Sequence, residues 1–85
     1  MARFEMADAA TLGEGNADSF FELGMMYSIG LSVPTDFVSA HKWFNIAALR
    51  GNKEAIRLRQ EIAAQMSESE IAAAQRAARA WLKAH

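Results

Sequence analysis

The sequence predicts an all-α fold in which short helices stack as an α/α helical-repeat solenoid. Proline occurs once and glycine five times in 85 residues, and most of the glycines lie between segments whose apolar residues recur at helical spacing. The chain also matches itself, because Gly15-Asn16 recurs as Gly51-Asn52. Such a period is typical of repeats that bury their apolar faces by stacking. About four main helices are expected, with a short additional helix before Gly13.

Size and composition limit the class of protein. A single domain over residues 1–85 is expected, and the contents of 52% hydrophobic and 22% charged residues are typical of a globular chain. No apolar run approaches the roughly 18 residues that a membrane-spanning helix needs, so no membrane insertion is expected. The net charge of -1 gives no overall cationic field, and no nucleic-acid partner is expected.

Cysteine is absent, which excludes disulfides, thiolate zinc sites and cysteine nucleophiles. Residues 1–8 carry two acids and no apolar core of a secretory signal. The chain as given is therefore expected in the cytoplasm. If it is a fragment of a longer protein, a periplasmic or membrane-tethered location stays open.

The first main helix is expected over residues 17–28, after Asn16 as N-cap. Gly30 can supply the left-handed residue that ends it. Its buried stripe is expected to be Phe20, Leu23, Gly24 and Tyr27. The weaker helix before it has Phe4, Ala7, Thr11 and Leu12 available for one face.

The second helix is expected over residues 37–50, capped by Thr35 or Asp36 and ended by Gly51. Its buried side is expected to comprise Phe37, Ala40, Phe44, Ala47 and Ala48, with Trp43 beside them. We expect Gly24 and Ala48 to allow a close crossing of the first two helices. Tyr27 and Trp43 are expected to fill the wedge between repeat units.

The third helix is expected over residues 53–66, with Arg57 and Glu61 paired across one turn. Its apolar stripe is Ala55, Leu58, Ile62 and Met66. A capping box of Ser67 and Glu70 then predicts a break at Met66-Ser67 and a last helix over residues 68–84. The inward residues of that helix are Ile71, Ala74, Ala78, Trp81 and Leu82.

The self-match extends to the later helices, since Ala40 and Trp43 recur as Ala78 and Trp81. The second copy has diverged, with Arg59-Gln60 where Leu23-Gly24 would recur. We therefore divide the chain into an N-terminal segment (1–14), an intact repeat (16–51) and a degenerate C-terminal capping repeat (52–85).

The intact repeat resembles a Sel1-like repeat, a relative of the tetratricopeptide helix pair. The residues that carry the resemblance are Leu23, Gly24, Tyr27, Gly30, Asp36, Ala40, Trp43, Ala47, Ala48 and Gly51. Ser19 and Ser32 depart from the pattern, which usually has alanine and glycine at these positions. The resemblance implies an α/α solenoid that serves as an adaptor in protein–protein interaction, frequently in bacterial signalling, envelope or regulatory assemblies.

No enzyme, metal site or cofactor is expected. His41 and His85 are the only histidines, and no HxxxH or HExxH spacing accompanies them. Ser39 and His41 lie two positions apart on one helix, so their side chains point in different directions. We expect His41 to be a partly exposed polar residue.

The first helix carries more apolar residues than one buried face can hold. Phe21 and Met25 point about a third of a turn away from Phe20 and Leu23. They either pack against another part of the chain or line a groove for a partner helix. The partner-binding residues predicted on this basis are Phe21, Glu22, Met25 and Ser28.

Charge is divided unevenly along the chain. The acids Glu5, Asp8, Glu14, Asp18 and Glu22 lie in the N-terminal half and suit a basic partner if they are more than solvated surface. Most of the basic residues lie in the C-terminal half and suit an acidic peptide. The leading hypothesis is an adaptor that binds a peptide or helix of another protein. The alternative is a structural C-terminal cap of a larger solenoid, or a homo-oligomerisation module.

Overall fold

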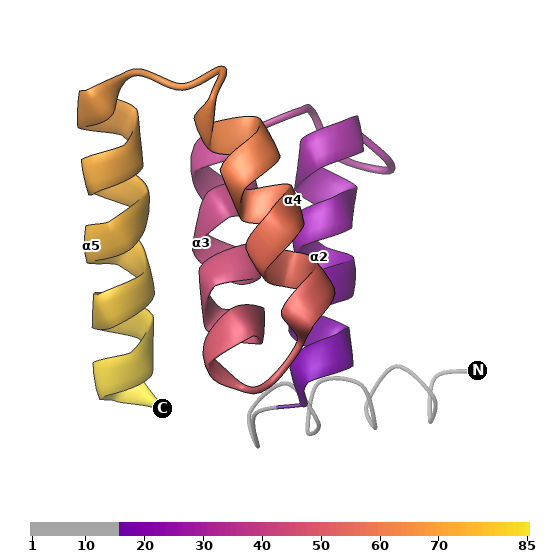
Figure 1. Cartoon of the computed structure of the whole chain (residues 1–85), viewed down its shortest axis with the longest axis vertical. Coiled ribbons are helices and arrows are strands. Elements are labelled where there is room, and N and C mark those ends of the chain that lie inside the picture. The colour runs from indigo at the N-terminus through magenta and orange to yellow at the C-terminus, as the bar shows by residue number, and fades with distance from the viewer. Residues whose placement is uncertain (1–15) are drawn as a thin grey trace.

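The computed structural model describes residues 16–85 (Figure 1). Within that range the chain forms four helices and no strand, which confirms the all-α class for this part of the molecule. The helices are α2 (Ala17–Ile29), α3 (Phe37–Leu49), α4 (Lys53–Ala63) and α5 (Glu68–Ala84). The short helix expected before Gly13 lies outside the described residues.

Local capping determines where each helix begins. The N-caps are Asn16, Asp36, Asn52 and Ser67. Each of these side chains accepts a hydrogen bond of 2.9–3.1 Å from the amide three residues later. The carboxylate of Glu70 also accepts from the Ser67 amide at 2.9 Å, which completes the predicted capping box. All four expected helix starts are confirmed.

The helix ends are less uniform. Gly30 ends α2 with a φ of 74°, as expected. Helix α3 ends at Leu49, one residue before the expected end at Arg50. The expected end of α4 at Met66 is wrong, because the helix stops at Ala63. The amide of Met66 bonds to the carbonyl of Ala63, three residues back, so the chain tightens into a turn while Met66 still packs against the core.

Helix α3 is the centre of the structure. Successive helices run in opposite directions, and α3 packs against each of the other three (Figure 1). Four of its apolar residues have almost no exposed surface: Ala40, Phe44, Ile46 and Ala47. Because neighbours cover α3 on several sides, its buried surface extends beyond the single predicted stripe to include Ile46 and His41.

An aromatic cluster connects α2, α3 and α5. Phe20 on α2 stacks on Trp43 of α3 with ring centroids 5.9 Å apart, and its ring meets Trp81 of α5 edge-on at 5.2 Å. The two tryptophans contact each other at 5.5 Å. Phe20 is fully buried at the centre of this cluster, which ties the first and last described helices to α3.

The close crossing of α2 and α3 depends on Gly24, but its partner differs from the one expected. A β-carbon at Gly24 would meet the ring of Phe44, with no atom of Ala48 among its nearest neighbours. Ala48 is half-buried. Phe44 is one turn earlier on α3 and its flat ring needs the space that glycine leaves, so the crossing is formed by a glycine and an aromatic ring.

Candidate functional site

The predicted partner-binding residues lie along α2. Phe21 is half-buried and its ring packs on Phe44 of α3 at 5.7 Å, and Met25 is half-buried against the core. Glu22 is exposed. The Ser28 hydroxyl donates to the carbonyl of Met25 at 3.1 Å. This face therefore combines a charged residue with apolar side chains that contact the core and keep part of their surface exposed.

Most of the repeat-motif residues have packing or turn roles. Gly24, Ala40 and Ala47 are buried, whereas Leu23, Tyr27, Trp43 and Ala48 are half-buried. Gly30 and Gly51 have positive φ angles, and Asp36 caps α3. Trp43 lies between α2 and α5, but Tyr27 borders the loop before α3, where its carbonyl accepts from the Asp36 amide at 2.9 Å.

The α2–α3 and α4–α5 loops lie at the same end of the molecule (Figure 1). A hollow of about 510 Å³ is lined by residues of both loops and of the adjoining helices, among them Tyr27. Its apolar and aromatic lining residues are Tyr27, Pro34, Phe37 and Val38. Its polar lining residues are Thr35, Asp36, Gln65 and Glu70. Sequence analysis missed this hollow because its walls come from segments about 30 residues apart, which only the tertiary fold brings together.

The two carboxylates of this hollow are fixed in position by helix capping. Asp36 accepts from the amide of Ser39 at 3.1 Å and from its hydroxyl at 2.8 Å. Glu70 accepts from the amide of Ser67. Within residues 16–85 no lysine or arginine nitrogen lies within 4.0 Å of either carboxylate. Among the described residues, their negative charges are therefore balanced by hydrogen-bond donors and the helix N-termini.

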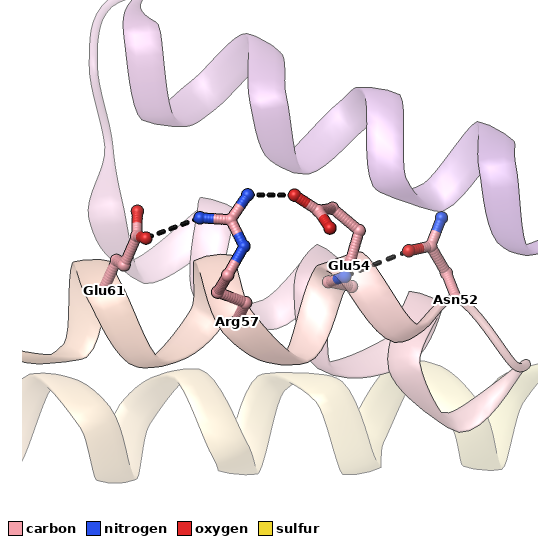
Figure 2. A network of polar contacts seen from close by, with 5 residues as sticks. Asn52, Glu54, Arg57 and Glu61 are labelled. Carbon is pink, nitrogen blue, oxygen red and sulfur yellow. Dashed lines mark hydrogen bonds and ion pairs between the residues drawn. The ribbon is translucent and has the colours of Figure 1, made fainter.

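Helix α4 carries a polar network on its surface. Figure 2 shows the guanidinium of Arg57 between Glu54 and Glu61. Arg57 donates to Glu61 at 2.7 Å, which confirms the predicted pair, and also to Glu54. The hydrogen bond to Glu54, its charge and the charge of Glu61 together raise the pKa of Arg57. All three side chains are more than half exposed, so the network contributes little to stability.

Asn52 links the starts of two helices. Its side-chain oxygen caps α4, and its Nδ2 atom donates to Oδ1 of Asp18 in the first turn of α2 at 3.3 Å. The two residues are 34 positions apart in the chain. The first turns of α2 and α4 therefore lie side by side.

His41 differs from its expected environment. It is only 4% exposed, and its Nδ1 atom has no hydrogen-bond partner. Burial first, and then the charge of Arg59, lowers the pKa of this imidazole. Arg59 is held nearby by a 2.6 Å hydrogen bond to Asn45, one turn after His41 on α3. This burial could not be predicted from the spacing of residues in α3, because it depends on how α4 packs against that side of α3.

Helix α5 presents a basic surface. Three exposed basic residues recur along it at spacings of three and four residues: Arg76, Arg79 and Lys83. A shallow hollow of about 400 Å³ on this helix is lined by Arg79, Leu82 and Lys83. On α3, Lys42 lies over the Trp43 ring at 4.3 Å, and partial burial lowers its pKa. The uneven charge along the sequence thus gives the C-terminal half of α5 a cationic surface.

In residues 16–85, no group of three or more histidine, aspartate or glutamate side chains is placed to hold a metal ion. Over the same range, none of the helices combines the length and the apolar character needed to cross a membrane. No family model, curated protein or solved structure matches the chain.

Proposed function

We propose that this chain is a helical-repeat module of the Sel1-like, tetratricopeptide-related kind, which binds a peptide or helix of a partner protein and performs no catalysis itself. The observation that carries the proposal is the recurring capped turn. Asn16 and Asn52 accept from the amide three residues later in the same way, at 2.9 and 3.0 Å. The bond from Asn52 to Asp18 joins the starts of the two units, as stacking of successive units requires.

The divergence of the second unit fits the same proposal. Helices α2 and α3 pack closely along each other, whereas α4 and α5 barely touch and each packs on α3. The position equivalent to Gly24 is Gln60, which is exposed. A glutamine leaves no space for the close crossing that glycine allows, so a degenerate closing unit is expected to pack more loosely.

The proposed binding surface is the α2 face of Phe21, Glu22, Met25 and Ser28. Half-buried methionine and phenylalanine side chains offer apolar surface to a partner. Because the core already restricts these side chains, binding costs little of their side-chain entropy. Glu22 at this surface is exposed and can select a partner by its charge.

This function can be tested by affinity capture with the full chain, followed by measurement of the captured partner's affinity. Glu22→Lys changes an exposed side chain on the proposed surface and is expected to weaken binding by about tenfold. Gln75→Lys introduces the same side chain on α5, outside that surface, and is the matched control. Equal affinities for the two variants would exclude the α2 face.

A second candidate function, a structural cap or a homo-oligomerisation module, is favoured by Ile56. This residue lies 36 positions after Phe20, yet it is 39% exposed whereas Phe20 is fully buried. A further unit, or a second copy, could cover it. Size-exclusion chromatography with light scattering distinguishes the candidates, since a dimer that is lost in Ile56→Glu supports oligomerisation and a stable monomer argues against it.

A further inference from the structure

The hollow between the two loops has the form of a side-chain binding site. Its volume of about 510 Å³ lies within the range of roughly 300–1,000 Å³ that is usual for ligand pockets. Its walls come from the end of α2, the following loop, the start of α3 and both sides of the α4–α5 break. Four elements thus converge on a space that could take one long side chain and part of a peptide backbone.

The charges that border this hollow favour a cation. Asp36 and Glu70 contribute one carboxylate each, and in the described part of the chain neither has a basic side chain within 4.0 Å. Each carboxylate oxygen can accept more than one hydrogen bond, so the capping bonds leave acceptor capacity for a ligand. Those capping bonds also hold the carboxylates in place, which reduces the entropy lost when a ligand binds.

The apolar lining favours a cation on a long aliphatic stem. Tyr27 and Phe37 contribute aromatic rings, and Pro34 and Val38 add aliphatic surface. Methylene groups of an arginine or lysine can pack on such a surface while the charged group reaches the carboxylates or an aromatic face. A carboxylate ligand would meet like charges, and a small apolar ligand would leave both carboxylates without a cationic partner.

We infer that this hollow binds the arginine or lysine side chain of a basic peptide segment in a partner protein. The inference rests on the proposed function, because it identifies the chemistry of the partner. It adds a second contact to that function, at the loop end of the molecule and separate from the α2 face. Arginine is the preferred side chain, since its planar group presents several donors and can bind a carboxylate through two parallel hydrogen bonds.

The test uses the full chain labelled with ¹⁵N and blocked alanine pentapeptides that carry one central residue. That residue is arginine, its neutral isostere citrulline, or glutamate. The arginine peptide is expected to shift the amide signals of Tyr27, Phe37 and Gln65 at about 1–10 mM. The citrulline peptide should bind about tenfold more weakly, and the glutamate peptide should not bind. Equal binding of the arginine and citrulline peptides, or shifts that lie elsewhere, would overturn the inference.

The caps allow the charges to be removed without removing the helix starts. Asparagine caps a helix as well as aspartate does, and glutamine can replace glutamate in a capping box. The double variant Asp36→Asn, Glu70→Gln is therefore expected to keep its melting temperature within a few degrees and to bind the arginine peptide about tenfold more weakly. If that variant fails to fold, the comparison of arginine with citrulline on the native chain decides the question.

Glu54→Gln is the matched control, because it removes one exposed carboxylate in the first turn of α4, at the other end of that helix from the hollow. It should leave binding of the arginine peptide unchanged. If the double variant binds the arginine peptide as tightly as the native chain does, the hollow is excluded while partner binding through α2 stands. If the double variant loses both the peptide and the captured partner but Glu22→Lys does not weaken the partner, the hollow stands and the proposed α2 surface fails.

Discussion

A β-carbon added to Gly24 would lie 2.5 Å from both Cδ1 and Cε1 of the Phe44 ring. Phe44 is 1% exposed, so the surrounding core prevents the ring from moving away. Helices α2 and α3 share the most extensive helix contact in the described part of the chain. The space that the ring needs explains why a glycine occupies the middle of a helix despite its cost to helix stability.

Gly24→Ala is expected to destabilise the fold. Alanine favours a helix over glycine by about 1 kcal/mol, but overpacking a core costs about 1–3 kcal/mol, and the rigid ring of Phe44 places this site toward the upper value. Thermal and urea denaturation of the full chain measure the difference. Adding Phe44→Leu should reduce the cost of the alanine, because the smaller side chain gives space. A higher melting temperature for Gly24→Ala alone would contradict the packing described here.

Ser32→Gly is expected to stabilise the fold by about 0.5–1 kcal/mol. Ser32 has a φ of 70°, a left-handed conformation that costs a residue with a β-carbon about 1–2 kcal/mol and glycine little. Part of the gain is lost to the larger entropy of glycine in the unfolded chain. Ser28→Gly, inside α2, is the control and should lower the melting temperature. Similar losses in both variants would show that Ser32 is not strained.

The helix starts and three of the four main helices could be predicted because they depend on local chemistry. A side chain such as Asn16 or Ser67 satisfies an amide three residues away, and the sequence contains both partners. The end of α4 was mistaken because Met66 continues the apolar spacing. Periodicity reports which residues pack, and it does not distinguish a last helical turn from a tighter turn that buries the same residue.

Features that depend on three helices could not be predicted in the same way. Ile46 and His41 are buried because α3 is covered on several sides, which is a property of the packing and not of the pattern within α3. The candidate partner face on α2 could be predicted, because this helix has more apolar residues than one buried side can hold. The hollow lined by Asp36 and Glu70 forms only when the fold brings the two loops to the same end of the molecule. Helix capping alone accounts for the presence of both residues in the sequence, so nothing in the pattern indicates a second role.

The stability of the fold is expected to decrease as the pH falls below about 6.5, because of His41. Its pKa is lowered from 6.5 by burial and by Arg59, so the folded state favours the neutral imidazole and the unfolded chain binds the proton more readily. The contribution is fully present above 6.5 and is lost as the pH falls toward the folded-state pKa. Urea denaturation between about pH 8 and pH 5 measures it, above the range in which most carboxylates titrate.

His41→Gln should remove the pH dependence in that interval, whereas His85→Gln should retain it. His85 is exposed and stacks on Trp81 at 4.3 Å, and it is the other histidine of the chain. A native chain whose stability rises on acidification, or an unchanged slope in His41→Gln, would show that the buried imidazole is not the group that titrates.

Asn52→Asp is expected to lower stability slightly by breaking the contact between the starts of α2 and α4. Aspartate caps a helix as well as asparagine, so the cap should survive, but the new carboxylate would lose the donor to Asp18 and face a like charge. Because both groups are exposed, the loss should be at most about 1 kcal/mol and should shrink when the salt concentration rises. Asn16→Asp is the matched control, since it keeps the other cap and should change stability much less. Adding Asp18→Asn to Asn52→Asp should restore the melting temperature, and a failure to do so would mean that the turn at Asn52 is positioned by the core alone and not by its contact with α2.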